Sequence, residues 1–313
     1  MMRIAVKQMK LILRKILLFF SIFVMSCDPA GSSFTPNPDP IIHADINIGS
    51  GMFIFSFNDI DIEVFYHVPE AYSSSSKIVI GLHGGSRDAE SVRDNMIQKS
   101  IDYNFVIVAP KLSSSNFSLG DGYILGNVYV DGDSPSVNTL NEEDEWSFSI
   151  IEPLFDSVKS SLSIENDKYN LFGFSAGAQF VHRFILFKPT ARFDKVVAGA
   201  AGWYTVPDNT IPFPYGLDNS ILMSTNLSDL LSRDLYIQVG ALDNNPNSAG
   251  LRHNEYADAQ GLNRVTRAIN FFETGQNIAE SLGFNLNWSI HVIQGAGHNL
   301  IPNAENACDL MFN

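Results

Sequence analysis

The pentapeptide Gly-Phe-Ser-Ala-Gly at residues 173–177 limits what this chain can fold into more than any other segment. A run typical of a β-strand, residues 168–172, leads into it, and a run typical of a helix, residues 178–187, leaves it. A serine on so tight a strand-to-helix turn is held clear of the sheet, and the glycines leave room where a β-carbon would clash. The pattern predicts that Ser175 is a nucleophile, which needs a base, an acid to orient that base, and a site for an oxyanion.

Candidates for the acid and the base follow downstream. Residues 234–240 form an apolar run typical of a buried parallel strand, and Asp243 comes shortly after it. The next strand-like run, residues 288–293, opens into a glycine-containing loop that carries His298. The chain order serine, aspartate, histidine is that of the α/β-hydrolases and differs from the orders in chymotrypsin and subtilisin.

A candidate oxyanion site lies upstream of the serine. The strand-like run 77–82 ends in His83-Gly84-Gly85-Ser86, a turn that exposes backbone N–H groups. We expect the N–H groups of Gly85 and Ala176 to form an oxyanion hole. We expect His83 to be a structural member of this turn and not the base, because it precedes the nucleophile in the chain.

These segments together resemble the α/β-hydrolase superfamily, and among its members secreted serine esterases of the polyhydroxybutyrate depolymerase and feruloyl esterase type. The resemblance extends from residue 60 to the C-terminus. It implies that Ser175 is the nucleophile, His298 the base and Asp243 the orienting acid, with oxyanion donors at Gly85 and Ala176. The chain departs from many of those esterases in having Gly85 where they carry a cysteine, and in having only two cysteines in total.

Two aspartates compete for the role of the acid. Some hydrolases draw the acid from the loop one strand earlier, which here makes Asp208 the rival of Asp243. We favour Asp243 because it follows the strand-like run 235–240 directly.

The segment after the strand-like run 195–200 is expected to emerge on the same rim as the nucleophile. Its aromatic residues Trp203 and Tyr204 are therefore predicted to line the substrate pocket. Farther along, Arg252 and Arg264 are candidates either for binding a substrate carboxylate or for a structural ion pair, and we favour the ion pair.

The remaining strand-like runs predict the fold class. Two alternating runs, residues 53–57 and 60–68, are separated by Asn58-Asp59 and predict an antiparallel hairpin at an edge. Continuous apolar runs predict parallel strands buried on both faces, and they lie at residues 78–82, 105–109, 169–173, 195–200, 235–240 and 289–293. The expected product is an α/β fold of the α/β-hydrolase type, a mostly parallel sheet with helices on both faces and its ligand site at the strand C-termini.

The N-terminus predicts export. Five basic residues within the first 15 are followed by a short apolar run at 16–25 and by Cys27, which resembles the lipobox of a bacterial lipoprotein. We therefore expect residues 1–27 to be a lipoprotein-type signal peptide with Cys27 lipidated, residues 28–48 a flexible Pro/Ser/Gly tether, and residues 49–313 a single catalytic domain. The expected location is periplasmic or at the cell surface. The alternative is ordinary secretion without lipidation, in which case Cys27 is lost or pairs with Cys308.

The net charge of the chain limits the kinds of partner that it is expected to bind. The formal net charge is −14, and removal of the five basic residues of the leader makes the remainder more negative still. An acidic exterior disfavours nucleic acid, so the expected partners are an ester substrate, small or polymeric, and a membrane reached only through the lipid anchor. The acidic residues around 131–133 and 142–145 lack the ligand spacing of a known calcium loop, and we expect no metal and no cofactor.

The sequence thus predicts a serine hydrolase that cleaves carboxylic esters through an acyl-enzyme. A serine peptidase or an acyltransferase using the same residues is the main alternative. A lipoprotein that binds without turnover is a third.

Overall fold

The computed structural model describes residues 45–313, all of which belong to one compact unit. The predicted signal peptide, Cys27 and all but the last four residues of the predicted tether lie outside the described residues. The strands are β1 (Gly49–Phe57), β2 (Ile60–Val68), β3 (Lys77–Leu82), β4 (Phe105–Pro110), β5 (Tyr169–Phe174), β6 (Phe193–Gly199), β7 (Leu235–Gly240) and β8 (Trp288–Ile293). Each strand-like run of the sequence therefore falls on a strand.

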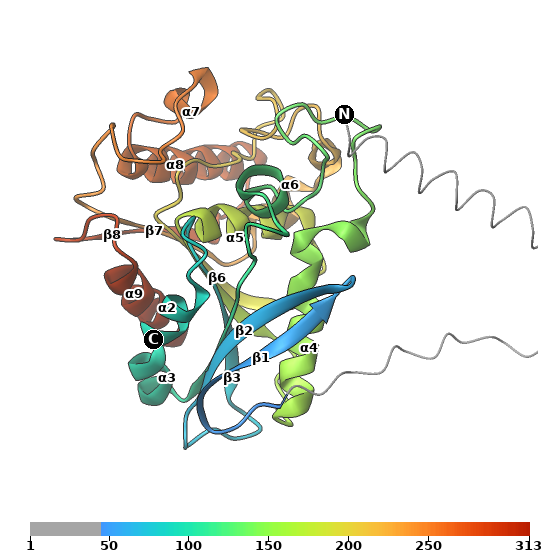
Figure 1. Cartoon of the computed structure of the whole chain (residues 1–313). Helices are drawn as coiled ribbons and strands as arrows, with labels where there is room; N and C mark the ends of the chain where they lie inside the picture. The colour runs from blue at the N-terminus through green and yellow to red at the C-terminus, as the bar shows by residue number, and fades with distance from the viewer. Residues whose placement is uncertain (1–44) are drawn as a thin grey trace, which may run out of the picture. The chain divides into compact units, whose positions relative to one another are not determined.

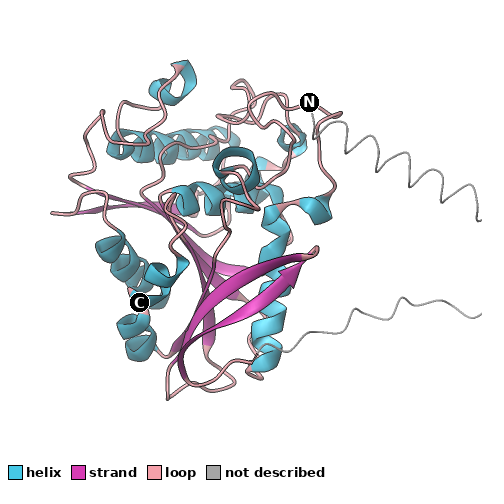
Figure 2. Ribbon diagram, in the orientation of Figure 1, coloured by secondary structure: helices cyan, strands magenta, loops and turns pink. Residues whose placement is uncertain are grey.

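The eight strands form a single sheet in the order β1-β2-β4-β3-β5-β6-β7-β8. β1 pairs with β2, and β2 with β4, in antiparallel register, whereas every pairing from β4 to β8 is parallel. The predicted sheet with its antiparallel edge hairpin is confirmed (Figure 2). The hairpin turn places Asn58 and Asp59 at φ 49° and 62°, the left-handed conformation that matches the twist of the flanking strands.

Helices cover both faces of the sheet (Figure 1). They are α2 (Ala89–Asp94), α3 (Ile97–Tyr103), α4 (Ile151–Ser161), α5 (Ala176–Phe187), α6 (Leu227–Leu231), α7 (Glu255–Ala259), α8 (Arg264–Leu282) and α9 (Leu300–Phe312), with shorter helical turns at Leu119–Ile124, Glu143–Glu145, Ser147–Ile150 and Ile221–Ser224. Figure 1 shows α2, α3 and α9 on one side and α4, α5 and α8 on the other.

The central parallel strands β3 and β4 are almost entirely apolar because they meet a helical layer on each side. Along β3, Ile78 and Ile80 pack into one hydrophobic cluster, and Val79 packs into the other. The cluster around Ile78 includes residues of α4, α5 and α8, whereas the cluster around Val79 includes residues of α2 and α9. This two-sided burial removes the polar alternation that a half-exposed strand would show.

Cys308 lies on α9 in the second of these clusters and is fully buried, as expected of a small core residue. Burial raises the pKa of its thiol to about 12, so the thiol stays protonated. Among residues 45–313, no helix is both long enough and apolar enough to span a bilayer.

Candidate active site

The turn between β5 and α5 holds Ser175 in a strained conformation with φ 56° and ψ −109°. Its backbone N–H donates to the carbonyl of Gly199 at the end of β6, at 2.8 Å. A β-carbon on Gly177 would lie 2.3 Å from the Leu82 carbonyl oxygen, and one on Gly173 would lie 2.1 Å from the Gly177 oxygen. The two glycines are therefore required by close backbone approach, and they let α5 begin directly after the serine.

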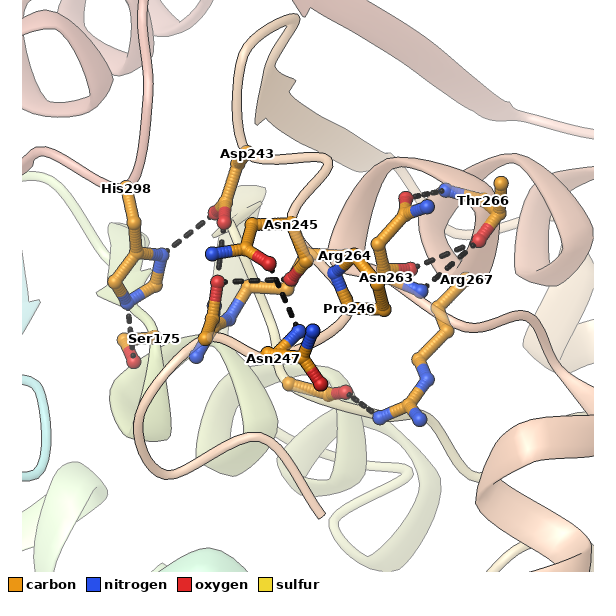
Figure 3. Close-up of polar contacts among 12 residues, drawn as sticks. Ser175, Asp243, Asn245, Pro246, Asn247, Asn263, Arg264, Thr266, Arg267 and His298 are labelled. Carbon is orange, nitrogen blue, oxygen red and sulfur yellow. Dashed lines mark hydrogen bonds and ion pairs between the residues drawn. The ribbon is translucent and has the colours of Figure 1, made fainter. Parts of the chain in front are cut away.

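His298 lies between the serine and an acid (Figure 3). Its Nε2 is 3.1 Å from Ser175 Oγ, and its Nδ1 is 2.6 Å from Asp243 Oδ2. Because a carboxylate only accepts hydrogen bonds, Nδ1 carries the proton and Nε2 is free to accept one from the hydroxyl. The aromatic ring of Phe174 stacks on the imidazole at a centroid distance of 4.9 Å.

The acid loop after β7 is fixed against the histidine loop after β8. Leu242 N–H donates to the Ala296 carbonyl at 2.8 Å, and Ala241 N–H donates to the Ile293 carbonyl at 2.9 Å. Asp243 itself is only 3% exposed. The backbone therefore fixes the separation between the carboxylate and His298.

The structure places the rival aspartate elsewhere. Asp208 Oδ1 accepts hydrogen bonds from the backbone N–H and the hydroxyl of Thr210, both at 2.7 Å. Asp208 thus shapes its own turn, and Asp243 is the carboxylate against His298.

The His-Gly-Gly turn after β3 borders the nucleophile. A β-carbon on Gly84 would lie 3.5 Å from the β-carbon of Ser175, and the next residue, Gly85, is exposed. Ala176 is the first residue of α5, where a backbone N–H has no partner within the helix. Ala176 therefore follows the serine directly in the chain, and Gly85 follows a residue that borders the serine in space.

The side chain of His83 stabilises this turn through two hydrogen bonds. Its Nε2 accepts from Leu112 N–H at 3.1 Å, so Nδ1 carries the proton and donates to the Gly84 carbonyl at 2.9 Å. Burial lowers the pKa of His83 to about 4, which keeps the ring neutral and structural, as predicted. The hydroxyl of Tyr123 donates to the His83 carbonyl at 2.7 Å, and the Arg87 guanidinium lies over the Tyr123 ring at 4.5 Å.

Trp203 and Tyr204 differ from the prediction that they line the pocket. Trp203 is 3% exposed, with the guanidinium of Arg183 at 3.9 Å and that of Arg252 at 4.8 Å from its ring centroid. Tyr204 is fully buried and stacks on Phe271 at 4.4 Å. The loop after β6 folds inward because these cation–π and stacking contacts bury the rings, so neither ring lines an open pocket.

Both arginines singled out in the sequence form ion pairs. Arg252 Nη1 lies 2.9 Å from Asp133 Oδ1 at the surface. Arg264 Nη1 lies 3.2 Å from Asp243 Oδ1, with both side chains almost fully buried. The charges were evident in the sequence, but the partner of Arg264 was not, because the contact depends on how α8 packs beside the acid loop.

Three residues that contact the site or its supporting turn were not identified from the sequence. They are Phe174, Tyr123 and Arg87. Phe174 had a local signal, since it lies next to the serine in the pentapeptide. Tyr123 had none, because it reaches the His-Gly-Gly turn across 40 positions of the chain.

Two cavities in the described part of the chain lie away from the serine. One of about 330 Å³ lies between the C-terminal part of α5 and α6, and one of about 380 Å³ lies between α8 and β8. Neither is lined by Ser175, Asp243 or His298. We therefore place the candidate site by its chemistry and not by cavity size. Within the described part of the chain, no group of three or more His, Cys, Asp or Glu residues is arranged to hold a metal ion.

No protein-family model and no curated protein matches this chain. Several solved structures, in contrast, are similar to this chain. Poly(aspartic acid) hydrolase-1 from Sphingomonas sp. KT-1 is similar with a TM-score of 0.79 and 30% identity, over 86% of this chain and 100% of that one. A poly(3-hydroxybutyrate) depolymerase from Bordetella parapertussis is similar with a TM-score of 0.77 and 26% identity, over 85% and 90% of the two chains. An S-formylglutathione hydrolase from Agrobacterium tumefaciens, at a TM-score of 0.51, 13% identity and coverage of 86% and 96%, shares the fold alone.

Proposed function

This chain belongs to the α/β-hydrolases of the polyhydroxybutyrate depolymerase and esterase type, and on that premise we propose that it cleaves carboxylic esters through an acyl-enzyme. The observation that carries the proposal is the continuous hydrogen-bonded series from Ser175 Oγ through His298 to Asp243, at 3.1 and 2.6 Å. A serine, a base within hydrogen-bond reach and an acid that orients the base are the groups that such a reaction requires.

Acylation begins when His298 Nε2 takes the hydroxyl proton of Ser175 and Oγ bonds to the ester carbonyl carbon. The carbonyl π electrons move to oxygen, and the N–H groups of Gly85 and Ala176 stabilise that oxyanion. When the tetrahedral intermediate collapses, the bond to the alcohol oxygen breaks, and the leaving alkoxide takes the proton from His298. The products of this half-reaction are an alcohol and an ester of Ser175.

Deacylation repeats the sequence with water as the nucleophile. His298 takes one proton from water, the hydroxide oxygen bonds to the acyl carbon, and the Ser175 oxygen leaves with the proton held by His298. The carboxylic acid is released, and the free serine is restored. Asp243 remains ionised throughout, keeps the proton on Nδ1 and stabilises the imidazolium that forms in each half-reaction.

Hydrolysis of an amide is the second candidate function. It is favoured by the 30% identity to a poly(aspartic acid) hydrolase, since the backbone of that polymer is joined by amide bonds. The same residues serve both reactions, with the amine leaving group taking the His298 proton in place of the alkoxide.

Labelling with a fluorophosphonate probe tests the proposal. The wild-type protein should be labelled at Ser175, and Ser175→Ala should not be labelled. Hydrolysis of nitrophenyl esters of increasing chain length, of feruloyl and 3-hydroxybutyrate esters, and of poly(aspartic acid) then separates the two candidates. An unlabelled wild-type protein that turns over none of these substrates would contradict the proposal.

We also propose that the protein is an exported lipoprotein, anchored through a lipid on Cys27. The basic residues, short apolar run and cysteine of the N-terminus support this, and they lie outside the described residues. An anchor of this kind would hold the catalytic domain at a membrane that its acidic surface does not itself attract.

A further inference from the structure

The buried ion pair between Arg264 and Asp243 has no part in the mechanism above. The two side chains are 4% and 2% exposed, and Arg264 Nη1 lies 3.2 Å from Asp243 Oδ1. The other oxygen of the same carboxylate, Oδ2, accepts from His298 at 2.6 Å. The carboxylate therefore has a cation at one oxygen and the imidazole at the other, and Figure 3 shows the first turn of α8 on the opposite side of Asp243 from His298.

Arg264 occupies a helix position that ordinarily disfavours a cation. It is the first residue of α8, at the positive end of the helix dipole. The helix start is already secured by a capping box, in which Asn263 and Thr266 each accept from the other's backbone N–H. Helix formation therefore does not account for an arginine here, whereas the carboxylate of Asp243 does.

The start of α8, which carries Arg264, is held by contacts that do not involve Asp243. One turn along, the fully buried Arg267 donates to the carbonyls of Gly202 and Gly261, each at 2.7 Å, and pairs with Asp258 at 3.0 Å. These contacts tie the start of α8 to the loop after β6 and to the turn before the helix. The guanidinium of Arg264 is thus presented to Asp243 from a fixed backbone.

We propose that Arg264 is a positioning residue of the active site: it fixes the orientation of the Asp243 carboxylate and balances part of its charge. This inference rests on the proposed function. A buried carboxylate beside a neutral imidazole is an uncompensated charge, which is costly in a protein interior. Arg264 supplies the compensation while His298 is unprotonated.

Among the described residues, Arg264, His298 and Tyr204 are titratable groups that interact with Asp243. Burial raises the pKa of Tyr204, and the nearby Asp243 raises it further, so the phenol stays neutral. Arg264 is therefore the cation that faces Asp243 in the resting site of the described chain. Removing its charge strengthens the negative field of Asp243 at His298, and the imidazole then keeps a proton to higher pH.

The test compares pH profiles of kcat/KM for a neutral nitrophenyl ester in the wild type and in Arg264→Gln, Arg264→Lys and Arg267→Gln. In Arg264→Gln we expect the acid limb to move up by about one pH unit. We also expect kcat to fall about tenfold or more, a part of the 10²–10⁴-fold that acid–base catalysis contributes, with KM little changed. Arg264→Lys should keep the acid limb in place, because it keeps the charge.

Arg267→Gln is the matched control, because it removes a buried arginine from the same helix turn but one that pairs with Asp258. It should lower the unfolding midpoint and move the acid limb less than Arg264→Gln does, because the charge of Arg264 is kept. If Arg264→Gln moves the limb no more than Arg267→Gln does, Arg264 is structural and the inference is wrong. If its main effect is a raised KM, with kcat and the acid limb unchanged, Arg264 binds substrate and the inference is again wrong.

A second comparison remains informative if Arg264→Gln alone does not fold. In Asp243→Asn the charge that Arg264 balances is gone, so Asp243→Asn/Arg264→Gln should fold and be as active as Asp243→Asn. A further tenfold loss in the double variant would overturn the inference. A wild-type protein without turnover or fluorophosphonate labelling would instead overturn the proposed function, so the two failures are distinguishable.

Discussion

Phe174 packs its ring on the imidazole of His298, with ring centroids 4.9 Å apart and planes inclined at 30°. The residue before the serine therefore contacts the residue that is hydrogen-bonded to the serine. The end of β5 and the turn after it thus present both a surface that contacts the histidine and the hydroxyl, although His298 comes 123 positions after the serine.

Removing that surface should weaken turnover more than stability. We expect Phe174→Ala to lower kcat about threefold to tenfold, since an aromatic pair contributes about 0.5–1.5 kcal/mol and its loss lets the imidazole leave the hydrogen-bonded orientation. Phe174→Tyr keeps the ring face and should retain most of the activity. Steady-state kinetics with a short nitrophenyl ester provide the measurement, and equal kcat values for Phe174→Ala and the wild type would contradict the prediction.

The serine and the histidine should act as one unit. Ser175→Ala and His298→Ala should each lower kcat by about 10⁴-fold or more, and the double variant should be little worse than either. The reason is that neither residue accelerates acyl transfer without the other. Single-turnover assays with purified, folded variants check this, and near-wild-type hydrolysis by Ser175→Ala would remove the basis of the proposed mechanism.

The buried histidine of the His-Gly-Gly turn, His83, should make stability depend on pH. The pKa of His83 is lowered from 6.5 to about 4 by burial, so the unfolded chain binds a proton there more readily than the folded chain. Its contribution is therefore present above pH 6.5 and is lost as the pH falls towards 4, by roughly 3 kcal/mol from this group alone.

Urea unfolding at pH 7 and at pH 4.5 measures this effect. The free energy of unfolding should fall between the two pH values, and His83→Asn should show a smaller fall. Part of the decline should persist in the variant, because burial also lowers the pKa of His182 well below its usual value. An identical pH dependence in the wild type and His83→Asn would contradict the assignment of the titration to His83.

The sheet was predictable because its signals are local. Each parallel strand reads as an apolar run, and the positions of Ser175, Asp243 and His298 follow from the strands that precede them. The burial of Trp203 was not predictable in this way. Its two guanidinium partners come from Arg183 and Arg252, one on α5 and one after the acid loop, and only the packed chain brings both of them against the indole.

The same limit applies to the ion pair of Asp243. From the sequence, we favour a structural ion pair for Arg264 over binding of a substrate carboxylate, but the sequence does not identify the partner. The pairing of Arg264 with Asp243 depends on the angle at which α8 leaves the preceding turn, which the contacts of Arg267 set. The pattern of residue types in the sequence does not specify that angle.

The anchoring proposal predicts a change of location without a change of chemistry. Wild-type protein expressed with its full N-terminus should partition into the detergent phase, because a lipid chain adds about 0.8 kcal/mol per buried CH₂. Cys27→Ser should remain unprocessed or partition into the aqueous phase, with ester turnover per labelled site unchanged. Mass spectrometry that finds an unmodified mature N-terminus away from Cys27 would reject the lipid anchor and leave the hydrolase assignment untouched.

The two aspartates should differ sharply in kinetics. Asp243→Asn keeps the shape of the acid but loses its charge and the tautomer it imposes on His298, so kcat should fall by about 10³–10⁴-fold, less than in Ser175→Ala. Asp208→Ala should be nearly silent in turnover, because that carboxylate accepts only from Thr210 in its own turn. Its expected cost is a lower free energy of unfolding, by about 1 kcal/mol for the lost side-chain hydrogen bonds. A collapse of kcat in Asp208→Ala, with Asp243→Asn tolerated, would move the acid to the earlier loop and require His298 to change partners in the working enzyme.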